Sequence, residues 1–176
     1  MRGDAALQAR LLLRGTGLAG ATVALGGGLA LVGAYQPWHA VTAELAMLTE
    51  DQSRPVAELA GWEAHPWGWL VPALGVVAIV LGAALVADRP PMRSRALLLS
   101  TAGALGASAG LGALLPPEVN RFDVAGSRLR ELSQLADRLP EGVELSFSVG
   151  IGNGLWITVG AAILILAGTV GARELP

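Results

Sequence analysis

The sequence contains no cysteine and no lysine, and its aromatic residues are few: five Trp, two Phe and one Tyr among 176 residues. The absence of cysteine excludes disulfides, thiolate metal sites and thiol catalysis. Charged residues make up 15% of the chain, against about a quarter in soluble domains. The chain is instead 53% hydrophobic with 24 glycines, a composition typical of closely packed membrane helices. The net charge of −2 gives no reason to expect a nucleic-acid partner.

Four apolar stretches are long enough to cross a bilayer core of about 30 Å, which takes roughly 20 helical residues. They cover residues 11–35, 67–86, 96–115 and 150–170. The first two are expected to form a lipid-facing pair, and the third, rich in Ala and Gly, to face protein more than lipid. The sequence thus predicts a membrane all-α protein, a four-helix transmembrane bundle in a single domain. A cleavable signal peptide is the competing reading of the N-terminus, but the first apolar run is too long for one.

Arginines predict how these spans are oriented, because basic residues concentrate in cytoplasmic segments. They stand before or at the start of the first span, between the second and third, and after the fourth: Arg2, Arg10, Arg14, Arg89, Arg93, Arg95 and Arg173. The other two connections, residues 37–66 and 116–149, carry more acids than arginines. We therefore expect a multi-pass plasma-membrane protein with cytoplasmic N- and C-termini and an extracytoplasmic cap built from these two connections.

Alternation of apolar and polar residues predicts strands within the cap. Residues 143–149 follow a period of two and lead into the fourth span. In the first outer connection, residues 41–47 and 56–62 flank a polar turn, which favours a hairpin, although Ala43–Glu50 is also rich in helix formers. An isolated strand needs partners for its backbone, so a small extracytoplasmic β-sheet of about three strands is expected. Residues 127–140 have the spacing of one amphipathic helix.

The tryptophans gather near the predicted outer ends of the spans. Trp and Tyr prefer the headgroup level of a membrane, so these residues are expected to mark an ordered interface: Trp38, Trp62, Trp67, Trp69 and Trp156. Asn153, at the predicted start of the fourth span, is expected to cap the helix, with ligand or partner binding as the alternative.

Three glycine motifs are best explained by helix packing. Residues 15–20 match the dinucleotide-binding pattern GxGxxG, but they open a predicted membrane helix and do not follow a strand. Residues 106–110 and 150–154 contain GxxxG spacing, which lets helix backbones approach closely within one bundle or between protomers. Packing within the chain is favoured, and a homo-oligomer is the alternative.

Two histidines give the clearest hint of a chemical site. His39 follows the first span and His65 precedes the second, so both imidazoles are expected at one outer interface, within reach of Glu63 and Glu44. Two His and a carboxylate can bind a divalent metal, and a pH-sensitive contact is a further alternative. An ordinary interfacial role is favoured, and no cofactor is expected.

The order of spans and loops resembles claudin-like four-helix proteins. Two features differ from that family: its paired cysteines are absent, and Gly154-Leu155-Trp156 stands before the fourth span and not in the first outer loop. Short motifs resemble actinobacterial four-helix membrane proteins of the tryptophan-biosynthesis-associated type. These motifs are Gln36-Pro37-Trp38, Gly61-Trp62 and the stretch 152–156. The resemblance implies a layout and no catalytic residues.

No mid-span acid, Lys or His is present, whereas pumps and exchangers place ionisable groups at mid-depth. The sequence favours a non-enzymatic membrane protein that acts through its cap, in contact with lipid and with another membrane or extracytoplasmic protein, as an accessory subunit or assembly factor. The alternatives are a metal- or ligand-binding protein or enzyme that uses the His/Glu cluster, and a small oligomeric channel or transporter.

Overall fold

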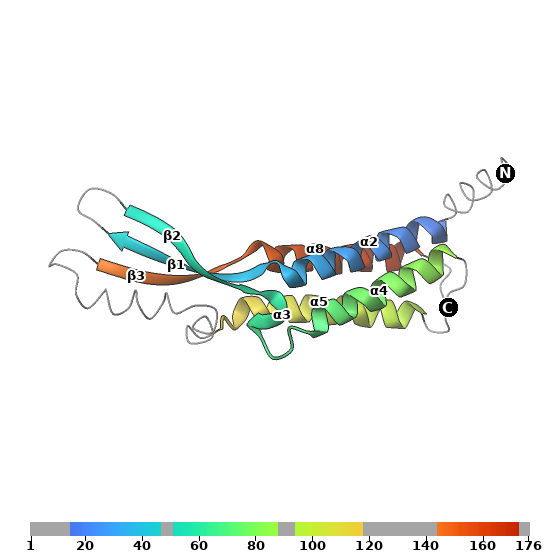
Figure 1. Ribbon diagram of the computed structural model, residues 1–176. Coiled ribbons are helices and arrows are strands. Elements are labelled where there is room, and N and C mark those ends of the chain that lie inside the picture. Colours follow the sequence, from blue (N-terminus) through green and yellow to red (C-terminus); the bar gives the residue numbers. More distant parts are fainter. Residues whose placement is uncertain (1–14, 47–50, 88–93, 118–143, 173–176) are drawn as a thin grey trace.

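The computed structural model describes residues 15–46, 51–87, 94–117 and 144–172. These residues form long helices that run side by side and three strands that project from one end of the bundle (Figure 1). The long helices are α2 (Gly15–Tyr35), α4 (Leu70–Val86), α5 (Ser94–Leu114) and α8 (Asn153–Gly171), and the short helix α3 (Gly61–Ala64) precedes α4. The strands are β1 (Pro37–Ala46), β2 (Asp51–Ala60) and β3 (Glu144–Ile151).

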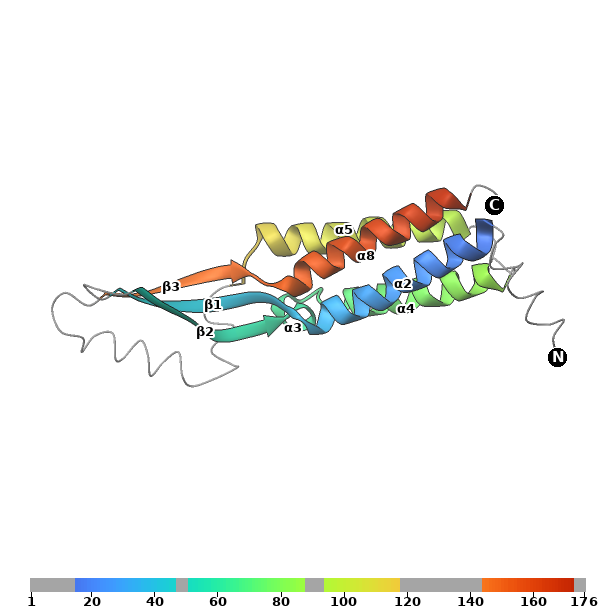
Figure 2. The same ribbon diagram turned by 90° about the horizontal axis from the view of Figure 1, so that it is seen from above.

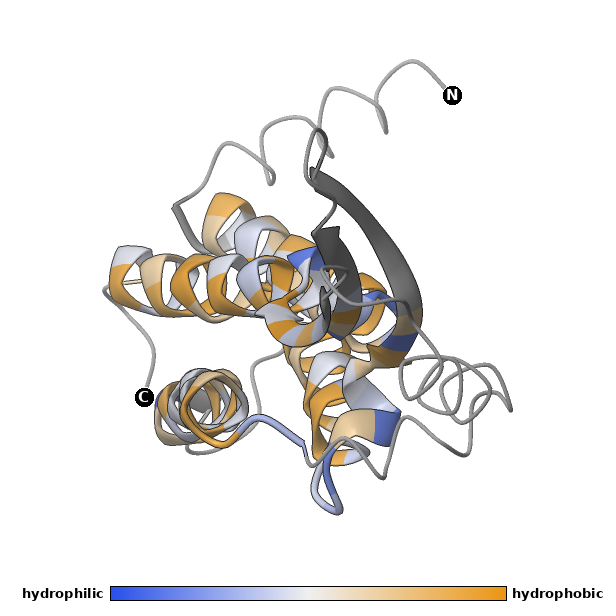
Figure 3. Cartoon of the chain, turned by 90° about the vertical axis from the view of Figure 1, so that its left-hand side faces the viewer, coloured by the Kyte–Doolittle hydropathy of each residue, from blue (hydrophilic) through white to orange (hydrophobic). Residues whose placement is uncertain are grey.

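Three of the helices are long and apolar enough to cross a membrane: α2, α5 and α8. The fourth apolar helix, α4, has 17 residues, which at 1.5 Å per residue is about 25 Å. It begins at Leu70 and not at the predicted Trp67, because residues 66–69 form a turn. Large apolar side chains point outward from every long helix, among them Leu25, Val80, Leu111 and Ile163, and apolar residues cover the outer faces of the bundle (Figure 3).

Helix α2 is the centre of the bundle because it packs along its length on both α4 and α8 (Figure 2). Small residues recur in pairs every seven positions along it, at Ala19-Gly20, Gly26-Gly27 and Gly33-Ala34. One member of each of the first two pairs faces α4: a Cβ on Gly27 would lie 2.6 Å from the carbonyl oxygen of Gly75, and one on Gly20 would lie 2.7 Å from that of Gly82. Such close antiparallel approach is what small residues permit.

The other glycine of the second pair and the glycine of the third pair face α8. A Cβ on Gly26 would lie 2.8 Å from the Ile165 side chain, and one on Gly33 would lie 3.0 Å from the carbonyl oxygen of Gly154. The packing role predicted for the glycines of residues 15–20 and 150–154 is therefore confirmed at Gly20 and Gly154.

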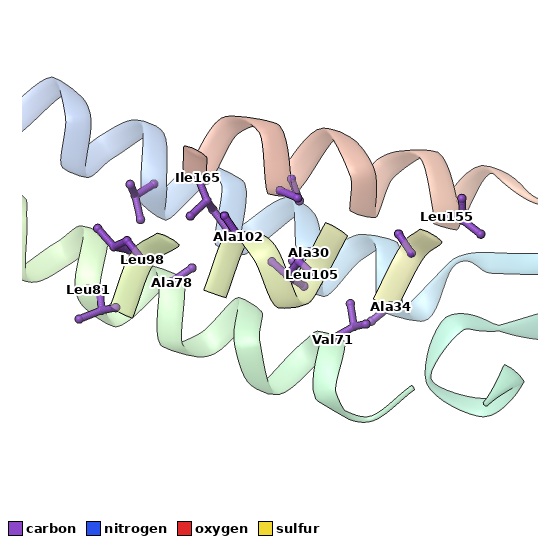
Figure 4. Close-up of a cluster of buried hydrophobic side chains, with 14 of the residues drawn as sticks. Ala30, Ala34, Val71, Ala78, Leu81, Leu98, Ala102, Leu105, Leu155 and Ile165 are labelled. Carbon is purple, nitrogen blue, oxygen red and sulfur yellow. The ribbon is translucent and has the colours of Figure 1, made fainter. Parts of the chain in front are cut away.

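The expectation that the third span is the buried one is wrong. The buried share of the span is 39% in α5, against 50% in α2 and 44% in α8. One face of α5 carries Leu98, Ala102 and Leu105 into the core (Figure 4). Gly103, Gly106 and Gly110 lie on an exposed side of the helix, where an added Cβ would meet nothing within 4 Å. Helix α5 therefore presents an open glycine surface, and the GxxxG spacing at residues 106–110 does not serve packing among the described residues.

The strands form one antiparallel sheet in the order β2-β1-β3, with β1 in the centre. Val41 pairs with Ala57 on one side and Val149 on the other, and the Val41 side chain is fully buried. The predicted hairpin and the predicted strand before the fourth span are both confirmed. The expected bounds of the second strand are wrong, because β2 runs over Asp51–Ala60 and most residues expected in the polar turn pair with β1. The predicted amphipathic helix over residues 127–140 lies outside the described residues.

The sheet is joined to the helices almost without linkers. Only Gln36 separates α2 from β1, and only Gly152 separates β3 from α8. The first and last long helices therefore continue directly into neighbouring strands, so the sheet extends the bundle (Figure 1).

Candidate functional site

Trp38 forms the junction between the sheet and the bundle. Its side chain is fully buried, and the indole Nε1 donates a hydrogen bond to the carbonyl oxygen of Gly33, at 3.0 Å. The ring lies between two glycines: a Cβ on Gly61 would overlap Nε1, and one on Gly112 would lie 2.8 Å from the far edge of the ring. We call Trp38 with Gly33, Gly61 and Gly112 the tryptophan joint. It brings together α2, β1, α3 and α5.

Backbone hydrogen bonds complete the joint. The amide of Gly152 donates to the carbonyl oxygen of Trp38 at 2.7 Å, and the amide of Gly61 donates to that of Gln36 at 3.3 Å. The start of β1 is therefore tied to the start of α8 and to the end of β2. Buried backbone groups need such partners, and here the same bonds fix the angle between the sheet and the helices.

The headgroup position predicted for Trp38 is wrong, because its indole nitrogen is paired inside the protein. Three of the other tryptophans differ from it. Trp62, Trp69 and Trp156 are 45%, 61% and 64% exposed, and they stand on α3 or at the start of α4 and α8, at the end of the bundle where the sheet begins. Trp67 is half-buried. Their exposure is compatible with the expected interface.

The capping role predicted for Asn153 is also wrong. Gly152 occupies the N-cap of α8, and no side chain caps the helix. Asn153 is the first helical residue, and its side chain is exposed.

His39 and His65 come together beside the tryptophan joint, as the sequence predicted. His39 follows Trp38 in β1, and His65 ends α3. Their ring centres are 5.7 Å apart in an edge-to-face arrangement, and the His65 ring stacks on Trp67 with centres 4.6 Å apart. The exposed fractions are 1% for His39 and 7% for His65, so this is an interior pair and not the surface contact expected for an ordinary interfacial histidine.

The surroundings of His39 favour the uncharged imidazole. Burial lowers the pKa of His39 below its usual value, and the neighbouring His65 lowers it further, while the backbone of Gly112 acts in the opposite direction. Neither ring nitrogen of His39 has a hydrogen-bond partner of ordinary geometry among the described residues. A buried polar group in this position needs an explanation such as an unseen water or ion.

Glu63, the carboxylate expected to join the histidines, has an exposed side chain on α3. No group of three metal-ligating side chains occurs within residues 15–46, 51–87, 94–117 and 144–172. The side chain of Glu44 lies outside what the structure describes. The Trp67 ring flanks His65, and the backbone of Gly112 near the end of α5 acts on His39.

Sequence reasoning missed Gly112, which contacts Trp38 and approaches His39 from a helix far along the chain. No local signal distinguishes it from the other glycines of α5. Gly61 could have been found more easily, because it precedes Trp62 in one of the short motifs noted above.

No protein-family model matches the chain, and no curated protein matches it at a significant level. The site must therefore be interpreted from its own geometry.

Proposed function

We propose that this protein is a four-span plasma-membrane protein whose extracytoplasmic sheet docks a partner, so that the chain acts as a non-enzymatic accessory subunit or assembly factor of a membrane complex. The observation that carries the proposal is the projection of the sheet. It extends beyond the helices, yet it is continuous with α2 and α8 and attached to them through the tryptophan joint. An element whose shape is set by such attachments before binding loses less freedom when a partner docks.

The distribution of side chains supports the membrane topology. The exposed tryptophans Trp62, Trp69 and Trp156 lie at the end of the bundle near the sheet, as expected of an outer headgroup belt. Helix α5 begins at the opposite end of the bundle, and Arg95 is its second residue (Figure 1). The proposed arrangement has both termini in the cytoplasm, α4 as a short fourth span, and the claudin-like layout suggested by the sequence.

The interior of the bundle supports a structural role for the helices. The buried hydroxyls of Thr101, Thr158 and Thr169 each donate to a carbonyl of their own helix. This bonding leaves these groups satisfied, so none of them is a candidate for lining a polar pathway. The described interior otherwise consists mainly of Ala, Val and Leu (Figure 4).

Two surfaces support a protein partner. Strands β2 and β3 are the edges of the described sheet, and a free strand edge can pair with an added strand. The open glycine surface of α5, at Gly103, Gly106 and Gly110, would allow a second helix to approach closely in the bilayer. The partner would then contact the sheet outside and α5 within the membrane.

Photo-crosslinking in native membranes tests the proposal. A crosslinking amino acid at Ser148, exposed on β3, or at Gly106, on the open face of α5, should capture the same partner, identified by mass spectrometry. The matched control is Ile163, an exposed position on α8, which should give lipid adducts only. Recovery of the protein alone in several mild detergents, with no protein adduct at either test position, would contradict a docking role.

A further inference from the structure

Two segments far apart in the sequence bring imidazoles together at the base of the sheet. His39 comes from the beginning of β1, and His65 from the connection between α3 and α4. Both side chains are more than nine-tenths buried. Neither belongs to the membrane-spanning helices, and neither contributes to the docking edges discussed above. Their function is therefore a separate question from that of the sheet.

His39 offers two ring nitrogens as ligand atoms. Both are buried, and neither makes a hydrogen bond of ordinary geometry to the described residues, although the backbone of Gly112 acts on the ring. A neutral imidazole is a donor at one nitrogen and an acceptor at the other, and leaving such a group poorly satisfied in the interior is unfavourable. A stable fold has little reason to bury it unless something binds there.

The spacing of the rings fits a shared metal ion. A zinc–nitrogen bond of about 2.0–2.1 Å puts the ion roughly 3.2 Å from the ring centre, so two imidazoles at a tetrahedral angle have centres roughly 5 Å apart. The observed centres are 5.7 Å apart. The separation of the two ring centres is therefore close to that of two imidazoles that share one ion.

The support of the rings also suits a metal. The Trp67 ring, parallel to that of His65 within 2°, restricts the orientation of the second ligand. Preorganised ligands lose less freedom on binding.

We propose that His39 and His65 bind one divalent transition-metal ion of the zinc type, with water in the remaining coordination positions. Imidazole nitrogen suits zinc, copper and nickel, whereas magnesium and calcium prefer oxygen. The ion links β1 to the connection that precedes α4, directly beside the tryptophan joint. Metal binding therefore stabilises the attachment of the sheet to the bundle.

Zinc binding to the intact chain tests this site. The protein is purified in mild detergent with a histidine-free affinity tag, stripped with a chelator and dialysed against Zn²⁺, and bound metal is measured by mass spectrometry. We expect one zinc per chain and a higher unfolding temperature with zinc than without it. Mg²⁺ at the same concentration should give neither effect.

Variants separate the site from adventitious binding. His65→Phe keeps a ring stacked on Trp67 but removes the ligand nitrogen, and His39→Gln removes the second ligand; each should weaken zinc binding at least about tenfold. Glu63→Gln, which alters an exposed carboxylate, should bind zinc as the unmodified protein does. If His39→Gln does not fold, His65→Phe alone carries the comparison.

Fluorescence gives an independent readout of where the metal lies. Cu²⁺ quenches a nearby indole, so titration with Cu²⁺ should quench Trp67, and the quenched component should be missing from Trp67→Phe. Three results would each overturn the proposal: no zinc retained by the intact chain, equal zinc binding in His65→Phe, or loss of zinc binding in Glu63→Gln.

Discussion

The indole nitrogen of Trp38 in β1 donates to the carbonyl oxygen of Gly33 in α2, across a distance of 3.0 Å. Gly33 lies in the last turns of the helix, where carbonyl groups lose their helical partners. A side chain from the following strand thus folds back onto the helix that precedes it. This bond sets the direction in which the sheet leaves the bundle.

Replacement of Trp38 by Phe should destabilise the protein by about 2 kcal/mol, because it removes a buried hydrogen bond and part of a fully buried ring. Thermal unfolding in detergent measures the loss. Trp69→Phe is the control, since Trp69 is 61% exposed and should change stability little. Equal unfolding temperatures for the two variants would contradict the role assigned to the tryptophan joint.

Gly112 and Gly110 give a matched pair on one helix. Alanine at Gly112 would press on the Trp38 ring at 2.8 Å, whereas alanine at Gly110 would meet nothing within 4 Å. We expect Gly112→Ala to cost about 1–3 kcal/mol through overpacking, and Gly110→Ala to be neutral or slightly stabilising. Chemical denaturation of both variants in one detergent measures the difference, and its absence would show that the ring can move aside.

Gly27 and Gly28 test the packing of α2 on α4 in the same way. A Cβ on Gly27 would lie 2.6 Å from the Gly75 carbonyl oxygen, while Gly28 faces open space. Because backbone cannot yield as a side chain can, Gly27→Ala should lower stability by about 1–3 kcal/mol. Gly28→Ala should not. Unfolding curves check this, and a stable Gly27→Ala protein would mean that the two helices can separate at little cost.

The metal-free protein should lose stability in acid. The folded-state pKa of His39 lies below its usual value, so at a pH between the two values the unfolded chain binds more protons. Stability therefore rises with pH through this window and levels off above about pH 6.5, the ordinary pKa of histidine. Among the described groups, His65 is the titratable neighbour that acts on His39.

Unfolding temperatures at pH 5 and pH 7.5, both in the presence of a chelator, measure this effect. His39→Gln should reduce the difference between the two temperatures, because it removes the group that must be buried uncharged. An unchanged difference in that variant would assign the acid sensitivity to other groups.

The strands were predictable because their pattern is local. Alternation at residues 143–149 is sufficient to predict β3, and a polar stretch between two apolar ones is sufficient to predict the β1–β2 hairpin but not where β2 begins, which is Asp51. The pairing of His39 with His65 followed from the expected antiparallel arrangement of the helices beside them. Such features depend on short stretches of chain and on the positions of helix ends.

The misplaced features depend on partners far away in the sequence. Trp38 resembles an interfacial tryptophan until Gly33, Gly61 and Gly112 are known to surround it. The glycines of α5 resemble a buried packing face, yet the closest packing is made by the glycines of α2. Composition indicates that helices can approach closely, but it does not identify which helix is the central one.

The central positions of α2 and β1 determine when the fold can be completed during synthesis. Both are made early, and each needs a partner from the end of the chain: α2 packs on α8, and β1 pairs with β3. Until those partners leave the ribosome, one glycine face of α2 and one edge of β1 remain without their partners. Since only Gly152 separates β3 from α8, one continuous segment covers both the glycine face of α2 and the edge of β1. A nascent chain that stops before residue 144 is therefore incomplete in the bundle and in the sheet at once.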